Sequence, residues 1–272
     1  MSLRCLSVVD YCRHYDSEPD TPARPMTDPS TTDAEHPRPV ILTDELKAQL
    51  NKVSTATLTQ QLQGRGIRNA YLSGLKPVVE GQRMVGYAHT LRYVPAREDL
   101  TDLTRGQNAQ RRAIEGLTQD EVLIMDARGE PHAGTIGDIF VMRSKLLGAA
   151  GVVTDGALRD TPAIRTIGLP VYHQSSHAAT WGRMHVPLDH QIPIACAGVT
   201  VFPGDILVGD GEGVVVLPAA LVEEIAAASV KQEIEEEWAL ERVAAGESTI
   251  GTFPIGKDRR AEFEAWAAAR DH

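Results

Sequence analysis

The 272-residue sequence contains few cysteines, and their positions argue against two classes of protein. Only three are present, at Cys5, Cys12 and Cys196, and no two of them form a Cys-x-x-Cys motif. A disulfide framework or a cysteine-rich zinc module needs paired cysteines at short, regular spacings. The sequence therefore predicts reduced thiols, as in a cytoplasmic protein.

Long apolar runs and dense clusters of basic residues are also missing. No segment approaches the roughly 18 apolar residues of a membrane span, and the first residues lack the apolar core of a secretion signal. The net charge is -10, whereas binding to a phosphate backbone needs clustered cations. We therefore expect a cytoplasmic protein that acts on a small molecule and has neither a membrane nor a nucleic acid as its partner.

Several common catalytic motifs are absent as well. The sequence has no Gly-x-Ser-x-Gly elbow, no Walker motif and no dinucleotide-binding fingerprint. Four histidines lie close together in sequence, but their spacing matches no compact zinc pattern, and packed or exposed histidines are the simpler interpretation. These histidines are His173, His177, His185 and His190.

The N-terminal part of the sequence predicts a leader followed by two helices. Residues 16–39 are rich in Pro, Asp, Ser and Thr, and such a segment cannot bury enough apolar surface to offset its ordering entropy. We expect a flexible leader over residues 1–39 and order from about Val40. Thr43 is placed to cap a first helix, and Ser54 or Thr55 to cap a second that ends at Gly64.

Strand and helix patterns alternate in the middle of the sequence. Short apolar runs rich in β-branched residues are typical of buried strands, and longer stretches between them are typical of helices. This order predicts a parallel or mixed sheet with right-handed crossovers. We expect strands at residues 84–94, 122–126 and 151–155, and helices at residues 99–116 and 136–147.

The last third of the sequence has a different texture. Short apolar runs separated by Pro and Gly predict a compact β-rich unit rather than further crossovers. A long helix follows over residues 219–245, with a Glu-rich segment that we interpret as a solvated face, and a short helix surrounds Phe263 and Trp266. We therefore predict one α/β domain over residues 40–218, and C-terminal helices over residues 219–272 that pack on it or on a neighbouring subunit.

The segment before the predicted helix at residue 136 is suited to binding an anion. The loop over residues 127–135 leads into this helix, and the free amides and dipole of a helix N-terminus favour a carboxylate or phosphate. Glycines also precede helices in many loops that bind nothing. The candidate substrate-binding residues are Gly134, Thr135, Ile136 and Gly137, and the acid Asp138 follows them.

A second candidate segment follows the next predicted strand. Arg159 and Asp160 come after that strand and a predicted turn at Gly156, so they should emerge at the carboxyl edge of the sheet. The alternative is a surface salt bridge, which contributes only about 0–1 kcal/mol. Because two neighbouring strand ends would meet at this edge, we expect Asp138, Arg159 and Asp160 to converge on one pocket.

Three segments of the sequence resemble a known family. They are VSTATL at residues 53–58, GDIFVMRSKLLGAAGVVTDGALRD at residues 137–160 and PGDILVGDGEGVVVLP at residues 203–218. The resemblance is to the family that unites 4-hydroxy-4-methyl-2-oxoglutarate and 4-carboxy-4-hydroxy-2-oxoadipate aldolases with the regulator of ribonuclease activity A. It covers residues 40–218, and its specific part is the spacing of Asp138 from Arg159 and Asp160.

The resemblance implies a role for each of these residues. Asp160 would ligate Mg²⁺ or Mn²⁺, mostly through a shell of waters, as suits a hard cation that keeps its hydration. Arg159 would contact the 2-oxo acid and steady the enolate oxygen, and Asp138 would order water at the metal. The amides from Gly134 to Asp138 would hold the substrate carboxylate.

The resemblance also implies a fold and an assembly. The family has a layered α-β-β-α sandwich of the swivelling β/β/α type, with a mixed sheet, and here a C-terminal helical extension would be added. Its members assemble as trimers or dimers of trimers with sites at subunit boundaries. Asp210 or Glu212 of a neighbouring subunit is therefore a further candidate at the metal.

The implied reaction is that of a class II lyase, which cleaves a 4-hydroxy-2-oxo acid to pyruvate and a carbonyl product. Oxaloacetate decarboxylation would use the same enolate and is an expected side activity. Two alternatives stay open, namely a decarboxylase of oxaloacetate-type 2-oxo diacids and a non-catalytic regulator of a ribonuclease. The regulator type lacks the complete set of Asp138, Arg159 and Asp160. Residues 129–137, GEPHAGTIG, differ from the Gly-Leu-rich loop of the aldolases, so the group beyond C4 stays open.

Overall fold

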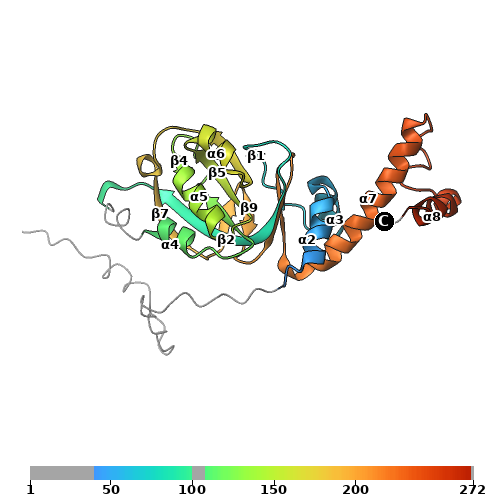
Figure 1. Cartoon of the computed structure of the whole chain (residues 1–272), viewed down its shortest axis with the longest axis horizontal. Helices are drawn as coiled ribbons and strands as arrows, with labels where there is room; N and C mark the ends of the chain where they lie inside the picture. The colour runs from blue at the N-terminus through green and yellow to red at the C-terminus, as the bar shows by residue number, and fades with distance from the viewer. Residues whose placement is uncertain (1–39, 100–107, 271–272) are drawn as a thin grey trace, which may run out of the picture. The chain divides into compact units, whose positions relative to one another are not determined.

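The computed structural model describes residues 40–99 and 108–270, which form a mixed α/β fold (Figure 1). The predicted leader lies outside these residues. No helix in the described ranges is long and apolar enough to cross a bilayer. The α-helices are α2 (Asp44–Lys52), α3 (Thr55–Gly64), α4 (Ala109–Glu115), α5 (Asp138–Leu146), α6 (Thr161–Ile167), α7 (Val222–Ala244) and α8 (Arg260–Ala268). The strands are β1 (Lys76–Pro77), β2 (Met84–Pro95), β3 (Glu121–Asp126), β4 (Gly134–Ile136), β5 (Gly151–Leu158), β6 (Val171–Ser176), β7 (His185–His190), β8 (Ile194–Cys196), β9 (Val199–Val201), β10 (Ile206–Gly209) and β11 (Val214–Leu217).

The predicted caps of the first two helices are confirmed. The Thr43 side chain accepts a hydrogen bond from the Leu46 amide at 3.2 Å, and the Ser54 side chain accepts one from the Thr57 amide at 3.1 Å. Each cap satisfies an amide that the helix itself leaves without a partner. Within the helix expected over residues 99–116, α4 begins at Ala109, because Asn108 has extended backbone angles and its side chain accepts from the Arg111 amide. Residues 100–107 of that prediction lie outside the described residues.

One nine-stranded sheet organises the fold, in the order β1-β6-β5-β3-β2-β10-β11, with β4 beside β5 and β7 beside β2. The neighbours β2/β3, β3/β5 and β5/β6 are parallel, as predicted for crossover connections. The sequence did not reveal the third crossover, in which the short helix α6 joins β5 to β6. The carboxyl ends of β3, β5 and β6 consequently lie at one edge of the sheet.

The expectation of a separate β-rich unit is wrong. β6, β10 and β11 belong to the large sheet, as does β7, which was not predicted, and only β8 and β9 pair apart from it. The physical reason is edge pairing, because β10 supplies hydrogen-bond partners along the open side of β2, from Met84 to Tyr87. Short apolar runs alone do not show which strand they pair with.

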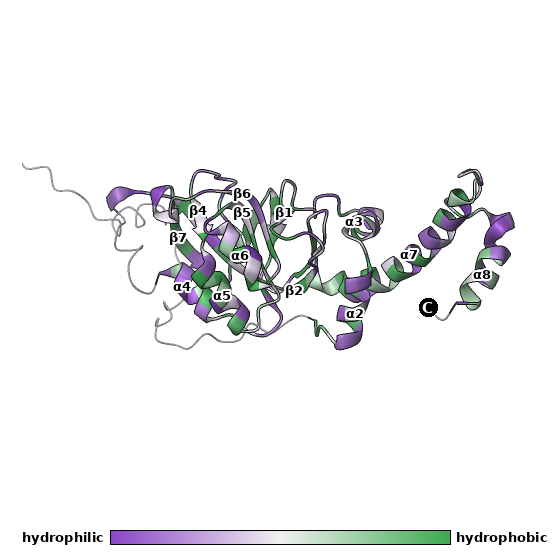
Figure 2. Cartoon of the chain, turned by 45° about the horizontal axis from the view of Figure 1, so that its top comes forward, coloured by the Kyte–Doolittle hydropathy of each residue, from purple (hydrophilic) through white to green (hydrophobic). Residues whose placement is uncertain are grey.

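Helices cover both sides of this curled sheet. On one side α4, α5 and α6 bury Ile114, Val141 and Ile164 against the strands. On the other side, the β8–β9 hairpin and the inner faces of β10 and β11, which form the curled end of the sheet, pack against its central strands. The outer faces of β10 and β11 are covered by α2, α3 and α7. Figure 2 shows apolar residues along the strands and mixed surfaces on the helices. This arrangement gives the α-β-β-α order that was expected.

The C-terminal helices have a small core of their own. Trp238 of α7 is fully buried against Phe263 of α8, and the Arg259 guanidinium lies 4.8 Å from the Trp238 ring centroid. The interpretation of the Glu-rich segment as only a solvated face is wrong. Glu233 accepts a hydrogen bond from the Ser54 amide, and Glu235 forms a 2.8 Å ion pair with Arg260.

Candidate functional site

The junction of β5 and α6 positions the Arg-Asp pair. β5 runs through Gly156 to Leu158, so the predicted turn at Gly156 is wrong. Glycine is needed there because a Cβ would lie only 2.8 Å from the Cβ of Ala127. Arg159 therefore follows the strand directly. Asp160 caps α6 in the left-handed conformation, with φ 53° and ψ 31°, and its side chain is exposed.

The second half of the site lies where β4 meets α5. The predicted helix over residues 136–147 begins two residues later, because Gly134 to Ile136 pair with β5 as a short strand. Gly137 then caps α5, and Asp138 is its first residue. The Asp138 carboxylate accepts a hydrogen bond from the Ile139 amide at 2.8 Å and is half-exposed. An acid in the first turn is favoured by the helix dipole.

The two segments approach each other closely at Gly134 and Gly137. A Cβ on Gly137 would lie 2.7 Å from Asp160 Oδ2, and a Cβ on Gly134 would overlap Cγ of Arg159. The Arg159 amide also donates to the Ile136 carbonyl at 3.0 Å. Both glycines are thus required for close approach, since any side chain would push the charged residue away.

Not every predicted site residue reaches the surface. Thr135 is fully buried, and its hydroxyl donates to the Ala157 carbonyl at 3.0 Å. Ile136 is 2% exposed and belongs to the core under α5. The Gly134 amide already donates to the Ala179 carbonyl at 2.8 Å. These three residues are therefore structural, and they position Gly137 and Arg159.

Arg159 is held by its own neighbours. Its Nε donates to the Ala178 carbonyl at 3.0 Å, and its stem lies over Gly134. Its two terminal nitrogens make no hydrogen bond with the residues that the structure describes, so the guanidinium fork can bind an anion such as a carboxylate.

A cavity of about 430 Å³ opens beside Asp160. Most residues that line this cavity were not predicted, because no sequence pattern indicates that α6 and the end of β6 face the same space. Thr161 and Ser176, two residues of its lining, share a hydrogen bond at 2.9 Å between their hydroxyl oxygens. Its lining includes Asp160, Thr161, Arg165, Ser176, His177 and Ala178.

The described side chains at this site do not form a preassembled metal cage. Within residues 40–99 and 108–270, no three His, Cys, Asp or Glu side chains gather as a ready-made metal cage. Zinc sites usually need three or four nitrogen or sulfur ligands. Asp160 has an exposed carboxylate, an oxygen donor of the kind that Mg²⁺ and Mn²⁺ accept, and the metal stays a prediction.

We expect Gly137→Ser to weaken the site without weakening the fold. The new Cβ would displace the Asp160 carboxylate, whereas the serine hydroxyl would cap α5. Because small misplacements of reacting groups are costly, kcat/KM should fall about 10- to 100-fold with an unchanged melting temperature. The matched control is Gly64→Ser, since a Cβ there would meet nothing within 4 Å. Equal loss in both variants would contradict this reasoning.

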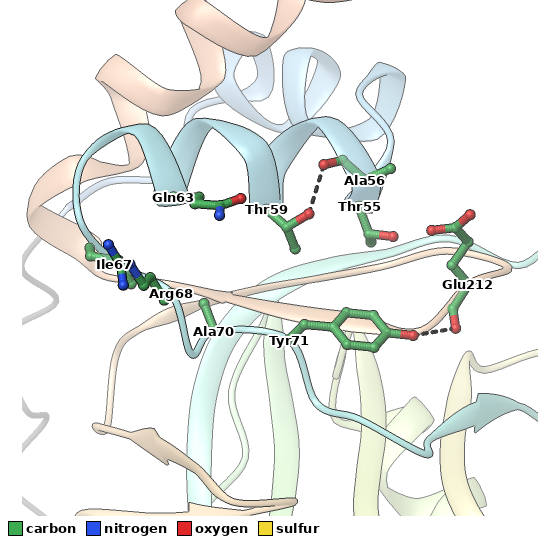
Figure 3. A pocket seen from close by; sticks show the side chains of 9 residues that line it. All are labelled: Thr55, Ala56, Thr59, Gln63, Ile67, Arg68, Ala70, Tyr71 and Glu212. Carbon is green, nitrogen blue, oxygen red and sulfur yellow. Dashed lines mark hydrogen bonds between the residues drawn. The ribbon is translucent and has the colours of Figure 1, made fainter.

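The two acids of the β10–β11 turn have different roles. Asp210 is nearly buried and accepts hydrogen bonds from the Thr55 amide and hydroxyl, both at 2.8 Å, and from the Glu212 amide at 2.9 Å. It therefore clamps α3 to the turn. The Glu212 carboxylate is exposed and makes no bond to any described residue, while its carbonyl accepts from the Tyr71 hydroxyl at 2.7 Å. Figure 3 shows Glu212 at the end of a second cavity of about 510 Å³ below α3.

Asp210 gives a prediction for stability against pH. Burial acts to raise the pKa of Asp210, but its hydrogen bonds with Thr55, Glu212 and Gly213 outweigh burial and lower it. A lowered pKa means that this stabilisation is present above the unfolded value of about 3.9 and is lost as the pH falls through the folded value. Asp210→Asn should therefore cost about 1–2 kcal/mol at neutral pH and much less in strong acid.

Urea unfolding at pH 7 and at about pH 2.5 measures this difference. Asp205→Asn is the control with the opposite sign, because burial raises the pKa of Asp205 despite its backbone hydrogen bonds. A cost for Asp210→Asn that stays the same at both pH values would show that the carboxylate charge is not responsible.

Comparisons with known proteins agree with this fold. A family described as RraA-like, Aldolase/RraA, matches residues 55–216. A protein from Halalkalibacterium halodurans named "Putative 4-hydroxy-4-methyl-2-oxoglutarate aldolase" is 29% identical over 189 residues, which is 70% of this chain and 84% of that protein.

Two solved structures share the fold. Streptomyces coelicolor RraAS2, described as an unusual member of the RNase ES inhibitor RraA protein family, is 34% identical, with a TM-score of 0.67 over 72% of this chain and 96% of that one. An uncharacterised protein from Pseudomonas syringae has the same TM-score at 24% identity, covering 77% and 97% of the two chains, and supports the fold alone. Because the family match spans more than half of the sequence, this chain belongs to the RraA-like (Aldolase/RraA) family.

Proposed function

We propose that the protein is a divalent-metal-dependent, class II lyase that cleaves a 4-hydroxy-2-oxo acid to pyruvate and a carbonyl product. The observation that carries this proposal is the close approach of the Arg-Asp pair to the start of α5, through Gly134 and Gly137. It brings a guanidinium fork, an exposed carboxylate and a second acid to one sheet edge. A non-catalytic surface has no need for this combination.

The residues divide the work of binding. The terminal nitrogens of Arg159 hold the 2-oxo acid. Two N–H groups of a planar guanidinium match two neighbouring oxygens, either both oxygens of a carboxylate or one carboxylate oxygen and the adjacent keto or enolate oxygen. The N-terminus of α5 faces the substrate carboxylate, where the helix dipole favours a negative charge, although the Ile139 amide already donates to Asp138. Asp160 would hold Mg²⁺ or Mn²⁺, with Asp138 fixing water beside it. The bound ion would polarise the 2-oxo group and offset the charge of the enolate.

The bond changes follow from this placement. A hydroxide oriented by Asp138 takes the proton of the 4-hydroxyl and becomes the water that later protonates C3, the new carbonyl forms at C4, and the C3–C4 bond breaks. Its electron pair becomes the enolate of pyruvate, whose oxygen is stabilised by Arg159. A proton then returns to C3 and pyruvate leaves. Oxaloacetate would yield the same enolate by losing CO₂, so its decarboxylation is an expected side activity.

A neighbouring copy of the chain is part of this proposal. We expect trimers or dimers of trimers, with Glu212 of one copy facing the site of the next. Of the two acids in the β10–β11 turn, only Glu212 has a carboxylate without a bond to the described residues. Light scattering during size-exclusion chromatography measures the assembly, and Glu212→Gln should lower kcat without changing the molar mass.

The second candidate is a protein-binding regulator of a ribonuclease. It is favoured by the similarity to RraAS2, whose description places that protein among RNase ES inhibitors. A regulator needs no exposed carboxylate beside Gly137, whereas a metal-dependent lyase does. The enzyme is therefore the better account of Asp160, and the same experiment separates the two.

The test is a substrate panel assayed for pyruvate with a coupled dehydrogenase. Several 4-hydroxy-2-oxo acids and oxaloacetate are compared with Mg²⁺, with Mn²⁺ and with excess chelator. Because divalent ions decarboxylate oxaloacetate slowly by themselves, Asp160→Asn protein serves as the background. Metal-dependent cleavage of a hydroxy acid supports the aldolase, and turnover of oxaloacetate alone supports the decarboxylase. No turnover, or full turnover in chelator, would overturn the class II lyase.

A further inference from the structure

We propose that Arg165 determines substrate specificity by binding a carboxylate attached to C4 of the substrate. This inference rests on the proposed function and deepens it, because it assigns a residue to the half of the substrate that becomes the carbonyl product. The observation behind it is a cavity that begins at Asp160 and has Arg165 in its wall.

The fold fixes where Arg165 points. Thr161 and Ile164 are buried, so α6 cannot turn about its axis. Arg165 lies four residues after Thr161, and residues at this spacing share one face of a helix. Both line the cavity beside Asp160. Arg165 is thus directed over the same space as the proposed metal ligand, one helical turn further on.

The cation of Arg165 is available for a ligand. It is exposed, and it makes no ion pair or hydrogen bond with the residues in the described ranges. Many other arginines are paired, as Arg143 is with Glu115 at 2.6 Å. The charge also reaches the strand below: burial lowers the pKa of His173, and Arg165 contributes in the same direction. This end of the cavity is therefore positive.

Hydroxyl groups in the lining of the cavity can complete an anion site. The Ser176 hydroxyl lies 2.9 Å from the Thr161 hydroxyl and 3.4 Å from Nε2 of His173. Hydroxyls can rotate to donate toward an oxyanion. A carboxylate in this space would find one guanidinium and hydroxyl donors together, a combination that strengthens hydrogen bonds through charge.

Charge explains why two arginines are needed. Arg159 binds the pyruvate half, which carries one carboxylate, and its fork is then occupied. A second carboxylate on C4 would otherwise lie beside Asp160 with no cation of its own apart from the metal. Arg165 supplies that cation, whereas a substrate with an uncharged group on C4 would leave Arg165 solvated and gain nothing from it.

The experiment compares two substrates in the full-length, metal-loaded protein. One is 4-hydroxy-4-methyl-2-oxoglutarate, which carries a carboxylate on C4, and the other is 4-hydroxy-2-oxopentanoate, which carries only a methyl group there. For Arg165→Gln we expect kcat/KM to fall about 10- to 100-fold on the first and to stay within about threefold on the second. Arg165→Lys should lose less, because it retains the charge without the fork.

Two controls make the outcome specific. Arg143→Gln removes an exposed arginine from the neighbouring helix and should leave both substrates unaffected. Exchange of the pyruvate methyl protons with deuterium, followed by proton NMR, reports on the pyruvate half alone and should be unchanged in Arg165→Gln. Higher salt should weaken the preference for the charged substrate, because Arg165 is exposed and screened.

Failure of the Arg165 assignment and failure of the proposed function give different results. Equal losses on both substrates, or no loss on either, would overturn the role of Arg165 while leaving the lyase intact. If wild-type protein cleaves neither substrate and exchanges no pyruvate protons, the proposed function fails and this inference fails with it.

Discussion

Replacing Asp160 with asparagine is expected to abolish metal-dependent turnover while leaving the fold intact. The loss in kcat should be at least about 1000-fold, because the variant cannot hold the cation that offsets the enolate charge. Asparagine is the sharper choice over alanine. Asp160 has φ 53°, a left-handed conformation that asparagine accepts and that costs other side chains about 1–2 kcal/mol.

The control for this variant is Asp258→Asn, which changes another exposed acid, at the start of the C-terminal 3₁₀ turn. Its rate should equal that of the wild type. Calorimetric titration with Mn²⁺ gives a second readout, since Asp160→Asn should bind the ion far more weakly. Wild-type rates in Asp160→Asn would remove the metal assignment altogether.

Arg159→Lys is expected to lower kcat/KM about 100- to 1000-fold although the positive charge is kept. The guanidinium uses Nε to bind the Ala178 carbonyl and still has its terminal nitrogens for the substrate. A lysine ammonium is a single point and cannot make both contacts in a fixed geometry. Misplacing a positioned group in this way is enough for a loss of this size.

Steady-state kinetics and thermal melting of this variant together distinguish a substrate-binding role of Arg159 from a structural one. Arg143→Lys is the matched control, because it changes an arginine that pairs only at the surface. A lower melting temperature combined with normal kinetics would assign Arg159 a structural role through Gly134 and Ala178.

Local chemistry made part of the fold predictable. Thr43 and Ser54 predict the starts of two helices, because an N-cap hydrogen bond depends only on residues that are close in sequence. The strands before Asp126 and Asp155 are readable for the same reason, as continuous apolar runs. The membership of β10 and β11 in the large sheet was not predictable, since it depends on hydrogen bonds to β2 from far along the sequence.

In the candidate site, too, features set by nearby residues were predictable and features set by distant contacts were not. The approach of Gly134 and Gly137 to Arg159 and Asp160 follows from the parallel strands β4 and β5, which end at one edge, whereas the shared role of Asp138, Arg159 and Asp160 stays a prediction. The turn predicted at Gly156 was wrong because the glycine serves tight packing within a strand. Arg165 could not be singled out, because an exposed arginine on a short helix has no distinguishing pattern until the cavity wall is seen.

The direct junction of β5 and α6 at Asp160 bears on how this family diversifies. Only Arg159 and Asp160 separate the strand from the helix, and Asp160 both adopts the left-handed conformation at the turn and carries a charge. The backbone requirement is met equally by asparagine or glycine. An aspartate codon becomes an asparagine or a glycine codon by a single base change. A lineage could thus lose the charge at this position in one mutational step, with no compensating change elsewhere in the scaffold.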